Sequence, residues 1–79
     1  MTDENIDHWA AADISEEAAN TAVELGSKRI AARLFERAAK HYEQAEAKAR
    51  AERDHELEAL AGDYAFHCKM QAEHLTAAE

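Results

Sequence analysis

The 79-residue sequence contains no proline and only two glycines, Gly26 and Gly62. Valine and isoleucine together occupy four positions, whereas alanine occupies 20. Alanine has the highest helix propensity because it loses no side-chain entropy in a helix, and β-branched residues favour strands. These scarcities exclude a β-rich domain. They predict an all-α fold, either a helical hairpin or a small three-helix bundle.

Cysteine occurs once, at Cys68, so the chain cannot form an internal disulfide and a reducing compartment is expected. The first residues, MTDENID, are acidic and polar, whereas a secretion signal opens with basic residues and continues with apolar ones. No run approaches the ~20 apolar residues that cross a bilayer. We therefore expect a cytoplasmic protein without a membrane partner.

Large apolar side chains are also few, with 16 after Met1. A domain of this length buries a smaller fraction of its surface than a larger domain does, and small domains often compensate by associating with another chain. The composition therefore favours a homodimer or a subunit of a larger assembly over an isolated monomer.

The spacing of apolar residues and of cap residues predicts how the chain is divided. Residues 1–14 are expected to form an acidic N-terminal arm, partly disordered or with a short helix, and residues 15–79 a single helical domain. Asp13 or Ser15, Ser27 and Asp54 are suitable N-caps, and Gly26 suits a left-handed helix exit. The predicted helices are 15–25, 27–51 and 54–76.

The turn near Arg53 is the least defined of these boundaries, because the sequence ERDHE contains neither glycine nor proline. Without that turn, the second and third helices would merge into one rod of about 50 residues, packed against another chain as a coiled coil. Between Glu43 and Glu56 there is no large apolar side chain. This part of the second helix is expected either to be solvated or to pack closely through alanine.

Charge is unevenly distributed along a chain whose net charge is −8. Residues 1–26 contain seven acids and no lysine or arginine, residues 27–42 contain five bases and one acid, and residues 43–79 contain nine acids and four bases. Four of the central bases follow one side of the second helix, where like charges repel. We call them the basic ridge: Arg29, Arg33, Arg37 and Lys40.

An acidic surface lying against the basic ridge would explain this arrangement. That surface could be the acidic N-terminal arm of the same chain or an acidic protein partner. The remaining alternative is that the ridge is solvated, with Glu36 and Glu43 near Lys40. Nucleic acid is disfavoured, because the overall negative charge opposes long-range attraction to phosphates.

The third helix has apolar side chains on two sides. Leu57, Tyr64 and Leu75 belong to its main apolar stripe, whereas Phe66 and Met70, four residues apart, face away from it. We call Phe66 and Met70 the outer pair. Either Ile6, Trp9 and the first helix cover the outer pair within the chain, or it is an interface for another subunit or partner.

The five histidines include candidate metal ligands. Glu52 and His55 form a Glu-x-x-His pair, the spacing of ligands in di-iron helical bundles, and a homodimer would supply a second pair with Glu43 or Glu46 as a further carboxylate. Asp63, His67 and His74 lie along one side of the third helix, but His67 and His74 are about 10 Å apart along the axis, too far for one ion. An exposed polar turn and surface histidines are the competing interpretations.

The sequence has no glycine-rich phosphate loop and no nucleophile paired with a base, and Cys68 lies on the main apolar stripe as a packed thiol. We therefore expect a non-enzymatic protein-protein interaction module without a cofactor, such as an accessory regulator, inhibitor or assembly subunit. It would bind a protein partner or a second copy through the basic ridge and the outer pair. One alternative is a metal-binding bundle based on Glu52 and His55, and another is an inhibitor that mimics nucleic-acid phosphates with the acids from Asp3 to Glu24.

Overall fold

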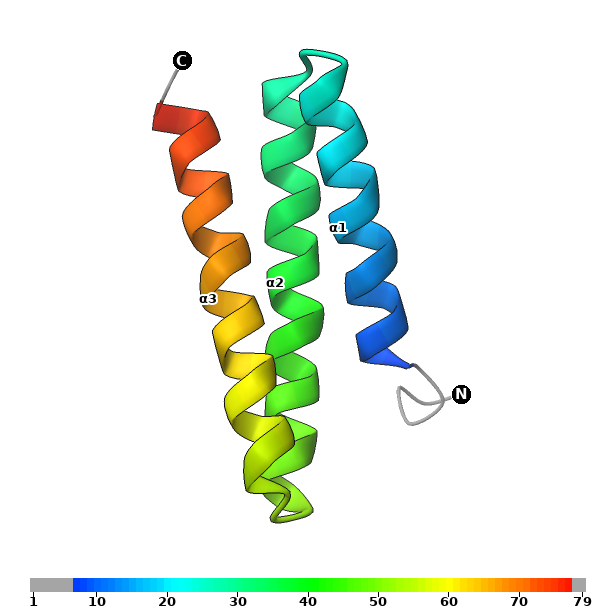
Figure 1. Ribbon diagram of the computed structural model, residues 1–79, viewed down its shortest axis with the longest axis vertical. Helices are drawn as coiled ribbons and strands as arrows, with labels where there is room; N and C mark the ends of the chain where they lie inside the picture. Colours follow the sequence, from blue (N-terminus) through cyan, green and yellow to red (C-terminus); the bar gives the residue numbers. More distant parts are fainter. Residues whose placement is uncertain (1–6, 78–79) are drawn as a thin grey trace.

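The computed structural model describes residues 7–77 of the chain, which form three helices and no strand within that range. The helices are α1 (His8–Glu24), α2 (Lys28–Ala51) and α3 (His55–Ala77). α2 lies between the other two and runs antiparallel to both (Figure 1). The all-α prediction is confirmed in its three-helix form.

The first helix begins earlier than predicted, so residues 8–14 belong to the helical domain rather than to an arm. Asp7 is the N-cap, and its side chain accepts a hydrogen bond from the backbone N–H of Ala10 at 3.2 Å. Ser15, one of the two predicted caps, is instead buried inside the helix against α2. Residues 1–6 lie outside the described range.

Both predicted turns are present. Gly26 has a φ of +84°, the left-handed conformation expected after the first helix. Ser27 occupies the N-cap position of α2, although its side chain makes no capping hydrogen bond. At the second turn Arg53 has a φ of +60°, and Asp54 accepts a hydrogen bond from the backbone N–H of Leu57 at 3.2 Å. The alternative of one merged rod is therefore wrong.

The helices pack mainly through small side chains. Ala38 on α2 and Ala19 on α1 are fully buried, and so is Ala61 on α3. Ala45 and Ala49 are also buried. The part of α2 that has no large apolar side chain therefore packs closely through alanine and is not simply solvated. At Gly62 an added Cβ would lie 2.9 Å from Oε2 of Glu46 on α2. These short contacts allow α2 to lie close to both neighbours.

α1 and α3 both pack on α2, but contacts between them are few. The Cα positions extend over 40 × 26 × 15 Å, with α1 and α3 on opposite sides of α2 (Figure 1). Several large apolar side chains remain partly or largely exposed as a result: Ile14, Val23, Leu25, Ile30, Leu57, Leu60, Tyr64, Phe66 and Met70. Within the described residues, no helix combines the length and the apolar character that a membrane span requires.

Candidate functional site

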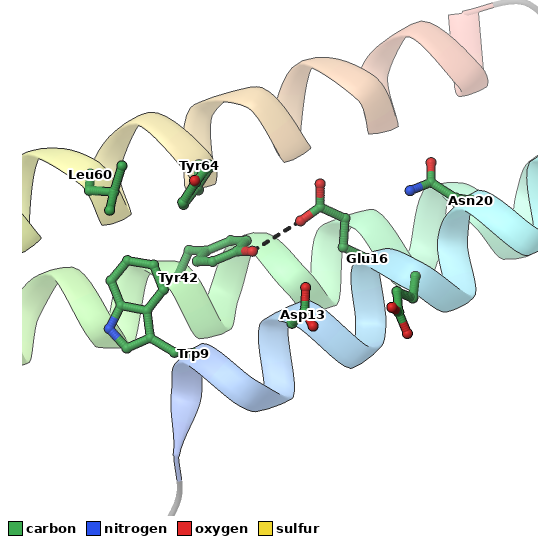
Figure 2. A pocket seen from close by; sticks show the side chains of 8 residues that line it. Trp9, Asp13, Glu16, Asn20, Tyr42, Leu60 and Tyr64 are labelled. Carbon is green, nitrogen blue, oxygen red and sulfur yellow. Dashed lines mark hydrogen bonds between the residues drawn. The ribbon is translucent and has the colours of Figure 1, made fainter.

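A groove of about 560 Å³ lies between α1 and α3, with α2 beneath it (Figure 2). α1 contributes one side, α3 contributes the other, and Tyr42 of α2 lies between them. We call this feature the groove, lined by Trp9, Asp13, Glu16, Glu17, Asn20, Tyr42, Leu60 and Tyr64.

Three aromatic rings, one from each helix, pack together at one end of the groove. The ring of Trp9 meets Tyr42 and Tyr64 nearly edge-on, with centroids 5.7 and 6.1 Å apart and interplanar angles of 73° and 85°. Tyr42 and Tyr64 are 5.2 Å apart. Edge-to-face pairs of this kind contribute about 0.5–1.5 kcal/mol beyond their buried area. This cluster connects the N-terminal part of α1 to both other helices.

Tyr42 also connects α2 to α1 through a hydrogen bond. Its hydroxyl donates to Oε1 of Glu16 at 3.0 Å (Figure 2). Burial raises the pKa of the Tyr42 hydroxyl well above its usual value, and the bond to Glu16 raises that pKa further. The hydroxyl therefore stays protonated near neutral pH and orients the Glu16 carboxylate.

The α1 side of the groove is acidic. Asp13, Glu16 and Glu17 all line it, and the ion pairs within residues 7–77 involve none of these three carboxylates. The groove thus combines aromatic rings with carboxylates that form no ion pair within the described residues. Such a surface suits guanidinium and ammonium groups, which bind both to aromatic faces and to carboxylates.

The basic ridge lies on α2, and all four of its side chains are exposed. No acid among the described residues lies within ion-pair distance of them. Glu43, expected near Lys40, forms its ion pair with Lys69 of α3. Asp13, which belongs to the predicted acidic arm, lines the groove together with Glu16 and Glu17. Residues 1–6 of that arm lie outside the described range.

The outer pair is exposed: Phe66 retains 65% of its accessible surface and Met70 49%. The expectation that Trp9 and the first helix cover it is wrong for the described residues, because α1 packs on α2 and Trp9 contacts Tyr42 and Tyr64. Ile6, the other residue expected to contribute, lies outside the described range. Phe66 and Met70 therefore form an apolar surface on the outer side of α3.

The predicted metal ligands are not gathered into a cluster. Glu52 terminates α2 and His55 begins α3, so the turn between them removes the helical spacing on which the prediction depended. The His55 side chain is 86% exposed, with Nδ1 3.8 Å from Glu58, and Glu46 lies 3.7 Å from Arg50. Asp63, His67 and His74 are exposed on α3. Residues 7–77 contain no group of three such side chains arranged to hold an ion.

Cys68 is buried at 1% exposure, as predicted for a packed thiol. Burial raises its pKa to about 11, with a smaller contribution from Glu16. The thiolate is the reactive form of cysteine, so a protonated thiol without access to solvent is inert near neutral pH.

Two features were missed in the sequence. His8 and His41 are 33 residues apart, yet their Nδ1 atoms lie 3.0 Å apart where α1 meets α2. The groove was also missed, although Asp13, Glu16, Glu17 and Asn20 recur at the three- and four-residue spacing of one helix face. That spacing was a usable signal for an acidic face, whereas nothing in the sequence indicated the histidine pair.

Comparison with known proteins gives no family for this chain: no protein-family model, curated protein or solved structure matches it.

Proposed function

We propose that the protein is a small, non-enzymatic interaction module that binds another protein through the exposed faces of its helices. The observation that carries this proposal is the exposure of the outer pair, Phe66 and Met70, on the side of α3 that faces away from α2. Contiguous apolar side chains on the surface of a small domain are typical of interaction sites. Accessory regulators, inhibitors and assembly subunits all act in this way.

The two surfaces named from the sequence have different roles in this proposal. The outer pair supplies apolar contacts, because fully burying a phenylalanine or methionine side chain contributes about 1.5–3 kcal/mol. The basic ridge supplies orientation and association rate, since exposed charges around an interface steer encounter more than they add affinity. The affinity for the partner would therefore depend mainly on the outer pair. The association rate would depend on the basic ridge and would fall as salt is added.

The test is a double substitution of the outer pair, Phe66→Ser with Met70→Ser. Tagged wild-type and variant chains are expressed in the native source, the co-purified proteins are identified by mass spectrometry, and the affinity for each recovered partner is measured. We expect the double variant to weaken partner binding at least about tenfold, because the apolar surface that Phe66 and Met70 still expose would no longer be buried by the partner.

The matched control is Ile14→Ser with Leu25→Ser, which removes two apolar side chains at least as exposed as the outer pair from α1 and the turn after it. Circular dichroism checks that both variants remain helical. The control should keep the partners and affinities of the wild type. Unchanged partners and affinities in the Phe66 and Met70 variant would contradict the proposal.

A further inference from the structure

We infer that the groove binds the basic ridge of a second copy of this chain, so that copies associate head to tail. This inference rests on the proposed function as a protein-interaction module and names one partner, the chain itself. Both halves of the contact are present among the described residues: an aromatic, acidic groove and an exposed row of arginines.

The groove has the chemistry that recognises guanidinium groups. Trp9 and Tyr64 line it and present aromatic surface (Figure 2). Asp13 and Glu17, four residues apart on α1, also line it. Arginine stacks on aromatic rings and forms charge-assisted hydrogen bonds with carboxylates, and both interactions strengthen when water is excluded. Glu16 is held toward Tyr42 by its hydrogen bond and adds a third negative charge.

The basic ridge matches the groove in spacing. Arg29, Arg33 and Arg37 recur every four residues, which places them about 6 Å apart along the helix. Asp13 and Glu17 are also four residues apart on α1, so two successive arginines meet two carboxylates in register. Ile30, which is 55% exposed, is next to Arg29 in the chain and supplies apolar surface for the Leu60 side of the groove.

The positions of the two surfaces determine the symmetry of the contact. Arg33 and Tyr42 are nine residues apart on α2, which at about 100° per residue places them on opposite sides of the helix. The ridge therefore faces away from the groove beneath which Tyr42 lies. In a two-fold dimer each ridge would have to lie in the groove of the other copy, which is impossible when the ridge and the groove face opposite ways. The contact is therefore heterologous, and it leads to rings or open chains of copies.

Self-association is measured by sedimentation velocity up to about 1 mM chain. We expect oligomers whose dissociation constant rises at least about tenfold when salt is raised from about 0.05 M to about 1 M, where the Debye length is about 3 Å. Arg33→Gln with Arg37→Gln removes ridge charge, and Asp13→Asn with Glu17→Gln removes groove charge. Each pair of substitutions should weaken association at least about tenfold at low salt.

Matched controls neutralise the same number of charges elsewhere on exposed surface. Lys28→Gln with Lys48→Gln changes α2 outside the ridge, and Glu56→Gln with Glu73→Gln changes α3 outside the groove. Both controls should associate as the wild type does. Circular dichroism confirms that every variant remains helical.

Mixing the two charge variants provides the sharpest test. The ridge variant keeps an intact groove and the groove variant keeps an intact ridge, so the mixture should form a 1:1 complex that does not extend further. The chain has a single tryptophan, Trp9, which lines the groove, so its emission should shift on mixing. A mixture that stays monomeric while the wild type associates would overturn the inference.

Two further outcomes separate this inference from the proposed function. A wild-type chain that is monomeric at low salt and about 1 mM overturns the inference and leaves partner binding by the outer pair intact. Self-association that is lost in the Phe66 and Met70 variant but kept in both charge variants also overturns it, because the contact then uses the outer pair. Loss in the charge variants with retention in the outer-pair variant supports it.

Discussion

At the scale of single residues, the contact between His8 and His41 makes the α1–α2 interface sensitive to acid. The two Nδ1 atoms lie 3.0 Å apart, a hydrogen bond that requires one ring to accept while the other donates. Burial lowers the pKa of His41, and the neighbouring His8 and Arg37 lower it further. Two protonated rings cannot keep this contact, so protonation opposes the packing of α1 on α2.

The free energy of unfolding should therefore fall on acidification through the range in which free histidine titrates, near pH 6.5. A histidine whose pKa is lower in the folded state than in the unfolded state contributes stability above the unfolded pKa and loses it as the pH falls. Urea unfolding at pH 7.5 and 5.5 measures the effect in wild type and in His41→Gln. The wild type should lose more free energy of unfolding than the variant; equal losses would contradict this assignment.

At the scale of helices, the close approach of α2 to its neighbours depends on alanine. Ala38 is fully buried, whereas Ala47, nine residues further along the same helix, is exposed. A leucine at the buried position has to separate the helices or adopt a strained conformation, and a leucine at the exposed position has to do neither.

Ala38→Leu should therefore destabilise the protein by about 1–3 kcal/mol. Ala47→Leu, which adds the same atoms to the same helix, should stay within about 0.5 kcal/mol of the wild type. Urea unfolding monitored by circular dichroism at 222 nm measures both. A similar stability for the two variants would show that α2 does not pack as closely as described.

The second and third helices were predicted within a residue at each end, because Ser27, Asp54 and a regular apolar stripe mark them. The start of α1 was missed because residues 8–14 hold a turn of alanines with few large apolar side chains, and the cap at Asp7 precedes them. The turn at Arg53 has a left-handed residue that is not glycine, so Asp54, the cap of the next helix, is its main mark in the sequence.

The outer pair and the basic ridge could be predicted from the sequence, whereas the groove could not. The outer pair and the basic ridge each belong to one helix, so the spacing of residues was enough to place them on exposed faces. The groove requires three helices at defined positions, and its aromatic cluster joins Trp9, Tyr42 and Tyr64 from separate segments. The pattern of a single helix contains no information about how two others lie beside it.

At the scale of the whole molecule, α2 is the element on which both others depend. α1 and α3 each pack on it and contact each other little, which leaves the groove open along one side. Negative charge and aromatic rings gather at the groove, and positive charge lies on the opposite side of α2. This polarity gives one molecule two complementary faces, which is the basis of the head-to-tail association inferred above.

The alanine contacts between helices also have a thermal consequence. The heat-capacity increment of unfolding scales with the apolar area that becomes exposed, and a core made largely of methyl groups exposes little. We expect an increment below the usual value of about 12–15 cal/mol/K per residue, measured by differential scanning calorimetry on dilute protein. A usual or higher increment would contradict this expectation. With a small heat-capacity increment, the free energy of unfolding changes little with temperature. The fold would then be nearly as stable at low temperature as at moderately raised temperature.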